Sequence, residues 1–321
     1  MVLMKTVYLT AFMVMAVLML IIPLSADADI NGVKAEPPSQ QVMAPADTAE
    51  KTEIRVRFTA TGDIAAYSAE DYIFGVVTAE MPALYEEEAL KAQAVAAYTY
   101  YLRKSASNNE EYDITDDYTV DQAFITPEKA REKWGAEAEK YEKKLRACVK
   151  DVLYKKVTYK GEPASTVYHA ISSGKTERAA DIWGGDYPYL VSVDSSFDKL
   201  SGNYLSTAKF TTDELKERLK NFVSVTEATG NGITDIKRTE AGSVTSLTVW
   251  GKSINGIDFR KALELRSADF DAEYKDGTYT FTVRGYGHGI GMSQNGANYL
   301  AQQGKSYEEI LLHYYTGCAV E

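Results

Sequence analysis

The sequence predicts a single large α+β domain with two lobes, preceded by an N-terminal transmembrane helix. Three observations support this fold class: a long apolar run near the N-terminus, segments with helical periodicity, and segments with the alternation of strands. The 321 residues, 45% of them hydrophobic and 25% charged, have the composition of an ordinary globular protein. After the N-terminal region about 270 residues remain, which is enough for one large domain with a sizeable core.

The N-terminal segment has the features of a membrane anchor. Lys5 precedes an almost unbroken apolar stretch over residues 7–24, close to the minimum length of a transmembrane helix. The small residues Ala26 and Ala28 also resemble a signal-peptide cleavage site, so a cleaved signal stays open as the alternative. We expect an anchor or uncleaved signal over residues 1–26, with Lys5 in the cytoplasm and the remaining chain outside.

Residues 27–52 should form a flexible linker, because Ala, Asp, Pro, Gln and Glu dominate there without a hydrophobic period. The folded domain then spans residues 53–321. It opens with residues 53–58, in which apolar and charged side chains alternate as they do in a half-buried strand.

Three helices should follow this strand. Ser68 and Asp71 resemble a capping box, and the helix that they open should end at Met81, before a proline. Residues 85–104 have acidic residues in the first turn, basic residues in the last and an alanine-rich middle, which predicts a second helix. A third helix is expected over residues 126–146, with proline at its start.

The rest of the chain is predicted to contain both strands and helices. Residues 152–159 and 164–169 suggest a hairpin around a Gly-Glu-Pro turn, and residues 270–284 suggest another around Asp-Gly. Further helices are expected near residues 212–222 and 306–315. This mixture is typical of an α+β protein.

Charge and cysteine content exclude some classes of function. A formal net charge of −11 argues against nucleic acid as a partner, because phosphate binding favours a basic surface. Cys148 and Cys318 form no Cys-x-x-Cys pair, so the sequence shows neither a zinc ribbon nor a redox motif. A long-range disulfide and two unpaired thiols both stay open. We expect no cofactor.

Glu80 is a candidate general acid. It falls on the same helical face as Val76 and Val77, where a solvated glutamate would have no reason to lie. Burial and the negative end of its own helix should both raise its pKa, as a general acid near neutral pH requires. The alternative is a structural role, in which Glu80 pairs with a cation such as Lys91 or lies in water at a frayed helix end.

Three other regions could contact a ligand. The alanine-rich helix presents Lys91 and Gln93 as polar contacts. Residues 168–177 end a strand in a polar, glycine-containing loop, which we interpret as a binding loop rather than a hydrolase dyad. Residues 285–296 contain five glycines without the ending of a phosphate loop, and such glycines favour close backbone approach to a ligand or a neighbouring strand. His288 lies among them and is expected to be functional.

Taken together, these motifs resemble the stage II sporulation protein D family. The resemblance rests on residues 74–82, 88–97, 168–177, 285–296 and 313–317, which occur in that order across the whole folded part. It implies a lytic transglycosylase of endospore-forming bacteria that cleaves peptide-free peptidoglycan glycan strands during engulfment of the forespore. The family's catalytic glutamate corresponds to Glu80, and the product would carry 1,6-anhydro-N-acetylmuramic acid ends.

The resemblance also implies a site, a location and partners. Substrate-binding roles would fall to Lys91, Gln93, Tyr168, His169, Ser172, Ser173, Lys175, His288, Gln294 and Tyr315, with Tyr314 as an alternative to Tyr315. The protein would be single-pass in the cell membrane, with the catalytic domain on the outer face. Its expected partners are glycan strands and the stage II sporulation proteins P and M.

Two departures from the family pattern affect these expectations. Tyr98 stands where the family commonly has arginine, so any contact of that arginine is in doubt. Some relatives carry a His/Cys zinc site that would fall within residues 105–126, but this segment contains neither residue, and we predict no bound zinc.

Two rival functions belong to other classes. The first is a non-catalytic glycan-binding protein that enhances a partner cell-wall amidase. The second is a metal-dependent peptidase or amidase that uses the three histidines.

Overall fold

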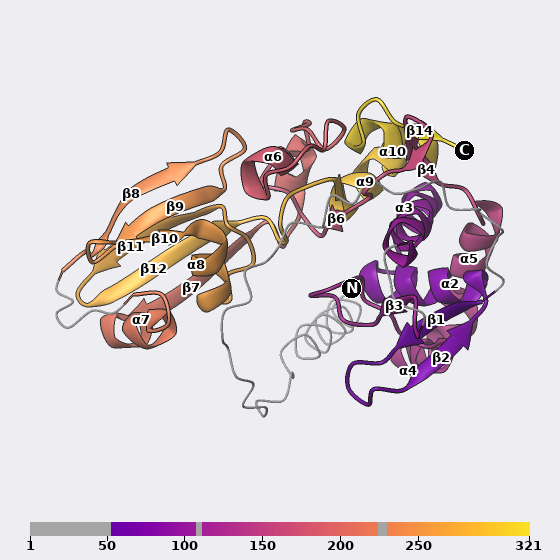
Figure 1. The fold of residues 1–321 in the computed structure, drawn as a ribbon, viewed down its shortest axis with the longest axis horizontal. Coiled ribbons are helices and arrows are strands. Elements are labelled where there is room, and N and C mark those ends of the chain that lie inside the picture. Colours follow the sequence, from indigo (N-terminus) through magenta and orange to yellow (C-terminus); the bar gives the residue numbers. More distant parts are fainter. Residues whose placement is uncertain (1–52, 107–110, 224–229) are drawn as a thin grey trace, which may run out of the picture. The chain divides into compact units, whose positions relative to one another are not determined.

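The computed structural model describes residues 53–106, 111–223 and 230–321. The expected anchor (1–26) and linker (27–52) lie outside these residues. None of the helices within the described ranges combines the length and the apolar character of a membrane span. Helices and several small sheets alternate along the described chain, which confirms the predicted α+β class (Figure 1).

The described chain begins with a three-stranded sheet. Strand β1 (Ile54–Arg57) pairs antiparallel with β2 (Ile64–Tyr67) and parallel with β3 (Ile114–Thr115). Ile54 and Val56 are fully buried while the two arginines between and after them face outward, as the alternation in the sequence predicts.

Helices α2 (Ala69–Glu80) and α3 (Glu87–Ser105) form the centre of the first hydrophobic core. The predicted cap of α2 is confirmed, because the Ser68 hydroxyl accepts a hydrogen bond from the Asp71 N–H at 3.1 Å. The two helices pack against each other through small and branched residues. Close packing of this kind holds both helices at fixed positions.

The prediction of one helix over residues 126–146 was wrong. Two helices occur there, α4 (Pro127–Trp134) and α5 (Ala138–Asp151), joined by the 3-10 turn η1 (Gly135–Glu137). Gly135 has φ +54°, which ends α4 and redirects the chain so that α5 packs on both α2 and α3. A single glycine inside a charged, helix-forming run costs too little for the sequence to reveal this break.

The predicted hairpin of residues 152–169 is much shorter than expected. Strands β4 (Val157–Tyr159) and β5 (Glu162–Pro163) pair around a tight turn. Residues 168 and 169 instead form β6 (Tyr168–His169), which pairs in parallel with β13 (Met292–Ser293). The partner of β6 lies more than a hundred residues away, so local sequence could not identify it.

A second core lies among the described residues between 205 and 284, which we call the second lobe. Sheets β11-β12-β7 and β10-β9-β8 are antiparallel, and buried aromatic side chains such as Phe259, Phe270 and Phe281 pack between them and the helices. The predicted hairpin around residues 276 and 277 is confirmed as β11 and β12. The elements are β7 (Leu205–Thr211), α7 (Thr212–Leu219), β8 (Ile233–Arg238), β9 (Val244–Val249), β10 (Lys252–Asn255), α8 (Gly256–Ala262), β11 (Phe270–Lys275) and β12 (Thr278–Arg284).

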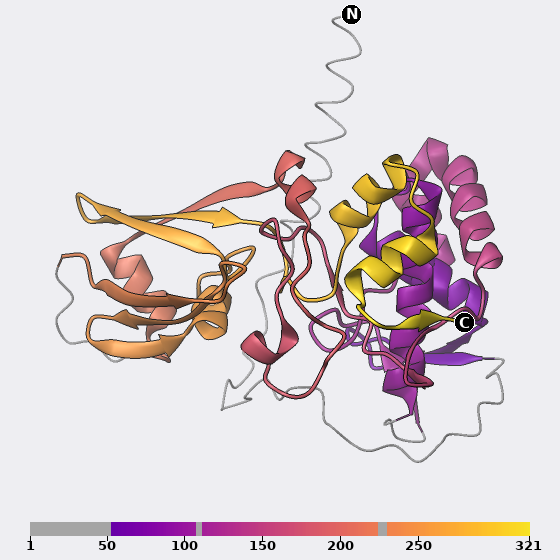
Figure 2. The same cartoon turned by 90° about the horizontal axis from the view of Figure 1, so that it is seen from above.

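The chain then returns to the first core, and the described residues within 53–204 and 285–321 form what we call the first lobe. Helices α9 (Gln294–Gln302) and α10 (Tyr307–Tyr314) both contact α3, and Figure 2 shows them beside it. The remaining elements are α6 (Ala179–Ile182), η2 (Ser196–Leu200) and β14 (Ala319–Val320), which pairs with β4.

Both cysteines are free thiols. Cys148 is buried in α5, and Cys318 is half-buried against the same core. Burial raises the pKa of Cys148 to about 11 and that of Cys318 to about 12. The sequence left both a disulfide and two unpaired thiols open, and the structure has two unpaired thiols.

We predict that Gly75→Ala lowers the free energy of unfolding by about 1–3 kcal/mol. A Cβ at this position would collide with the Ile125 carbonyl and the Phe124 ring. Urea denaturation measures the change. Gly202→Ala is the matched control, because its Cβ would meet nothing within 4 Å. Wild-type stability of Gly75→Ala would contradict this packing.

Candidate active site

Glu80 is the last residue of α2 and is half-buried. Met81 caps the helix in an extended conformation (φ −125°, ψ 146°), as expected of a residue that precedes proline. Glu80 therefore lies in the last turn of α2, the end of a helix at which a negative charge is disfavoured.

Two donors from distant parts of the chain hold the Glu80 carboxyl group. Its Oε1 accepts a hydrogen bond from the Ala123 N–H at 2.9 Å. Its Oε2 accepts one from Nε2 of Gln294, the first residue of α9, at 3.2 Å. The predicted site residues Glu80 and Gln294 are thus brought together across more than two hundred positions of sequence.

Burial raises the pKa of Glu80, and hydrogen bonds from Ala123, Gln294 and Tyr168 oppose that rise. The net direction is upward, as the position of Glu80 on the apolar face predicts. The hydroxyl group of Tyr168, on β6, also lies beside the carboxyl group. Such a carboxyl group can hold a proton nearer to neutral pH than an exposed glutamate can.

Gln93 contacts Gln294, the second donor to Glu80. It is fully buried on α3, and its Oε1 accepts a hydrogen bond from Gln294 Nε2 at 3.4 Å. Its own Nε2 has no partner among the described residues. Gln93 therefore orients Gln294, and its predicted direct contact with substrate stays a prediction.

Lys91 is ion-paired within the protein, and its predicted contact with substrate stays a prediction. Its ammonium group forms ion pairs with Glu88 at 3.0 Å and Asp151 at 2.6 Å. These pairs tie α3 to the end of α5 and leave Glu80 without this cation. The structural alternative in which Glu80 pairs with Lys91 is thereby excluded.

Sequence reasoning missed Gln122 and Ala123. Gln122 is buried and bonds to the Tyr168 hydroxyl at 2.7 Å, and Ala123 supplies the N–H to Glu80. Both lie in the segment between β3 and α4, which has no motif or periodicity. The burial of Gln122 distinguishes it from the other polar residues of this segment, and burial is not visible in the local sequence.

The glycine-rich segment packs against the segment that contains β6. Gly285, Gly287, Gly289 and Gly291 all have positive φ, and a Cβ at each would collide with residues 167–177. Of the two uses predicted for these glycines, the structure shows close approach to a neighbouring segment. This packing aligns β13 with β6 and so places Gln294 near Tyr168.

The two histidines of these segments contact each other. His169 is buried, its Nδ1 lies 3.1 Å from the Ile290 carbonyl oxygen, and its ring centre lies 5.7 Å from that of His288. His288 Nδ1 accepts a hydrogen bond from the Ile290 N–H, and its ring packs on Trp183. Burial lowers the pKa of His169 to about 4 and that of His288 to about 3, so both rings are neutral near pH 7.

Ser172, Ser173 and Lys175 bond within the protein rather than beside Glu80. The buried Ser172 N–H donates to Asp198 at 2.9 Å. The Ser173 hydroxyl donates to the Ala241 carbonyl at 2.9 Å, and Lys175 forms an exposed ion pair with Glu240 at 3.2 Å. The structure therefore does not bring these predicted residues to the candidate site.

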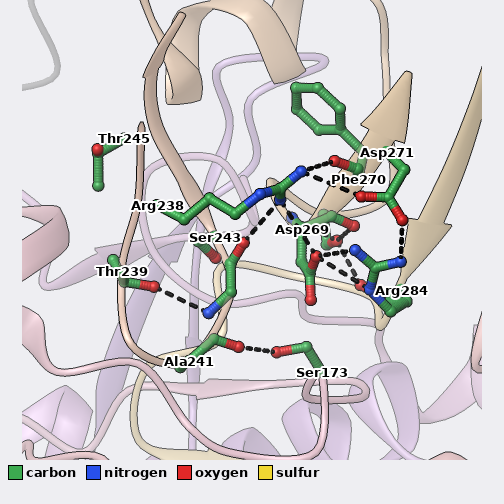
Figure 3. A network of polar contacts seen from close by, with 12 residues as sticks. Ser173, Arg238, Thr239, Ala241, Ser243, Thr245, Asp269, Phe270, Asp271 and Arg284 are labelled. Atoms are coloured by element: carbon green, nitrogen blue, oxygen red, sulfur yellow. Dashed lines mark hydrogen bonds and ion pairs between the residues drawn. The ribbon is translucent and has the colours of Figure 1, made fainter. Parts of the chain in front are cut away.

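The loop around Ala241 continues into an ionic network of the second lobe (Figure 3). Arg284 donates to Asp269 and Asp271, each at 2.7 Å, and Arg238 donates to Asp271 at 3.1 Å. Burial raises the pKa of Asp269, whereas the hydrogen bond from Arg284 lowers that of Asp271. Arg238 of this network also donates to the Gly242 carbonyl, next to the Ala241 carbonyl that accepts the hydrogen bond from Ser173.

Tyr314 and Tyr315 are fully buried. The Tyr315 hydroxyl donates to the Val167 carbonyl at 3.0 Å, and the Tyr314 and Ser195 hydroxyls lie 3.0 Å apart. Both hydroxyl groups are therefore bonded within the protein, and the binding role predicted for Tyr315, with Tyr314 as its alternative, stays a prediction.

Comparison with known proteins agrees with the motifs. Stage II sporulation protein D of Bacillus amyloliquefaciens is 39% identical over 252 residues, covering 77% of this chain and 72% of the relative. That of Bacillus subtilis strain 168 is 34% identical over 322 residues, covering 97% and 93%. A family model described as Stage II sporulation protein matches residues 58–159. The chain belongs to the stage II sporulation protein D family.

A more distant relative has another name. The amidase enhancer of Bacillus subtilis is 29% identical over 294 residues, which cover 76% of this chain and 39% of that protein.

Within the described ranges, no three or more His, Cys, Asp or Glu side chains lie together in a way that could hold a metal ion.

The departure at Tyr98 from the stage II sporulation protein D family pattern has a structural account. Its ring is buried, stacks on Tyr101 at 6.1 Å and meets Tyr154 edge to face at 5.8 Å. Tyr98 is therefore part of an aromatic cluster at the position where the sequence departs from the expected pattern.

We predict that Glu80→Gln raises the free energy of unfolding more at pH 7 than at pH 4. A raised folded-state pKa means that the contribution of Glu80 to stability is greatest below its unfolded pKa and is lost as the pH rises through its folded pKa. Urea denaturation at both pH values tests this. Glu273→Gln, at an exposed position of β11, is the control. An equal change at both pH values would contradict the prediction.

Proposed function

We propose that the protein is a lytic transglycosylase that cleaves peptide-free peptidoglycan glycan strands between N-acetylmuramic acid and N-acetylglucosamine. The observation that carries the proposal is the Glu80 carboxyl group, half-buried at a helix C-terminus with a raised pKa. Membership of a sporulation family supports a role in engulfment of the forespore.

In the proposed reaction Glu80 acts first as an acid and then as a base. Its proton passes to the glycosidic oxygen as the bond from that oxygen to C1 of the muramic acid breaks. The resulting carboxylate takes the proton of the 6-hydroxyl of the same sugar, and O6 forms a bond to C1. Glu80 ends protonated again, and the product is a 1,6-anhydro sugar.

This mechanism needs one carboxyl group, whereas ordinary glycosidases use two. Among the described residues, none of the hydrogen-bond partners of Glu80 is a carboxylate, and burial rather than a neighbouring charge is the main cause of its raised pKa. Because the attacking hydroxyl belongs to the substrate, it is already close to C1, and proximity lowers the barrier.

The Gln294 amide and the Tyr168 hydroxyl suit the polar groups of a sugar next to the scissile bond. The family resemblance adds a location and partners to the proposal. The chain would be anchored in the cell membrane with this site on the outer face, in a complex with the stage II sporulation proteins P and M.

A second candidate function is enhancement of a partner amidase through glycan binding. It is favoured by the similarity to the amidase enhancer of Bacillus subtilis. In that case Glu80 would not be needed for the function, and its carboxyl group would only accept the hydrogen bonds from Ala123 and Gln294. The two functions therefore differ in what a change at Glu80 does.

We predict that Glu80→Gln lowers the rate of glycan cleavage by about 10²–10⁴-fold, the usual contribution of a general acid, while glycan binding survives. The measurement is incubation of the purified protein with peptide-free strands, followed by mass spectrometry of the products. Wild-type protein should yield 1,6-anhydro ends.

Two outcomes would contradict the proposal. Products with reducing muramic acid ends would exclude the transglycosylase mechanism. The enhancer function would be favoured if the wild-type protein cleaved no glycan and Glu80→Gln stimulated an amidase as well as the wild type does. A parallel incubation with a metal chelator tests the metal-dependent alternative, which predicts loss of activity.

A further inference from the structure

The guanidinium group of Arg260, on α8, carries a charge that no acidic side chain balances within the described ranges. It is half-buried, and its Nε and Nη2 donate to the carbonyl oxygens of Leu265 at 3.1 Å and Arg266 at 2.8 Å. Burial lowers the pKa of Arg260, and the group that opposes this effect is the Tyr286 hydroxyl rather than a carboxylate. A partly buried charge of this kind is costly unless an opposite charge meets it.

Other arginines of the second lobe differ in this respect. Arg218 pairs with Glu264 at 3.1 Å, and Arg284 pairs with Asp269 at 2.7 Å. The guanidinium of Arg260 instead keeps N–H donors that no group among the described residues accepts. Arg260 is therefore prepared to bind an anion from outside the chain.

A single carbonyl group joins Arg260 to the glycine-rich segment. The Arg266 carbonyl oxygen accepts a hydrogen bond from Arg260 Nη2 and another, at 2.9 Å, from the Gly287 N–H. The guanidinium therefore lies beside the backbone that leads into His288. Burial is the main cause of the lowered pKa of His288 and of His169, and the charge of Arg260 lowers both further.

Aromatic side chains lie around this guanidinium group. Trp183 is half-buried, and its ring centre lies 5.2 Å from that of His288. Tyr286 is exposed, and the guanidinium of Arg266, a second exposed cation, lies 5.2 Å from the centre of its ring. Aromatic faces with polar edges suit sugar rings, which present both C–H groups and hydroxyls. The surroundings of Arg260 thus favour an anionic sugar.

The lactyl group of N-acetylmuramic acid is an anion only in a peptide-free strand. Its carboxyl group forms a neutral amide where a stem peptide is attached and is a free carboxylate where the peptide is absent. A guanidinium binds a carboxylate through two parallel, charge-assisted hydrogen bonds, whereas an amide offers one oxygen and no charge. N-acetylglucosamine has no such group.

We propose that Arg260 and Arg266 form a subsite that binds the lactyl carboxylate of a muramic acid, so that the protein selects strands without stem peptides. The inference rests on the proposed function, because it names the group of that substrate which is recognised. The glycine-rich segment 285–296 contains both Gly287, which bonds at this subsite, and Gln294, which bonds to Glu80. A strand with a carboxylate on every second sugar can therefore contact both places.

The test measures Kd by calorimetry for the full-length chain carrying Glu80→Gln, the parent in this experiment, so that bound strands are not cleaved. The ligands are a peptide-free glycan oligosaccharide, the same oligosaccharide with its carboxyl groups converted to methylamides, and a chitin oligosaccharide of equal length. We expect the parent to bind the peptide-free form about 10-fold or more tightly than the methylamide form.

Arg260→Gln in the parent should weaken binding of the peptide-free form by about 10-fold or more and leave binding of the chitin oligosaccharide unchanged. Arg266→Gln, at an exposed position that should not disturb folding, should weaken only the peptide-free form, by about threefold. Arg218→Gln is the matched control, because it removes the same charge from an arginine that already pairs with Glu264. It should bind every ligand as the parent does.

The proposal is overturned if the parent binds the peptide-free and methylamide forms equally. It is also overturned if Arg266→Gln binds the peptide-free form as tightly as the parent does, or if Arg260→Gln weakens the peptide-free form and the chitin oligosaccharide to the same extent. Glycan cleavage by the wild type is measured separately. If no strand is cleaved, the proposed function fails, but the Kd values still decide whether the subsite exists.

Discussion

Helix α2 is buried along most of its length, and this burial fixes the direction in which its last residue points. Its residues from Tyr72 to Thr78 are inaccessible to solvent, and Gly75 lets the segment around Phe124 approach the helix backbone. On another side the Arg146 guanidinium lies 4.4 Å from the centre of the Phe74 ring. A helix held in this way cannot rotate, so Glu80 must emerge at one position.

The groups around Glu80 reach it because other segments are forced into register. The parallel pairing of β6 with β13 sets Met292 beside Tyr168, and α9 begins two residues later with Gln294. That pairing depends on the alternating glycines, which let two backbones lie closer than side chains would allow. The close contact at Gly75 likewise holds the segment that presents the Ala123 N–H.

Opposed influences act on the candidate acid. Burial favours its protonated form, and the donors from Ala123, Gln294 and Tyr168 favour the carboxylate. A group balanced in this way changes its protonation state at little cost, which both halves of the proposed reaction require. The buried carboxyl group of Asp269 in the second lobe has a different environment, because it forms an ion pair with Arg284.

The sequence by itself determined the elements whose signals are local. The cap at Ser68, the strand at residues 54–57, the hairpin at residues 270–284 and the apolar face that carries Glu80 all depend on spacing within one segment. Motif order also determined the family. Capping, alternation and helical periodicity act over a few residues, so the chain displays them directly.

Only the tertiary structure decided which polar side chains meet Glu80. Lys91 carries the right charge and lies on the right helix, yet Asp151 and Glu88 lie within reach of it and bind it. Gln122 carries no motif, yet a carbonyl group on α3 fixes its amide beside Tyr168. A polar side chain bonds to whichever partners the packing brings within about 3 Å, and the packing of distant segments is not written in their local sequence.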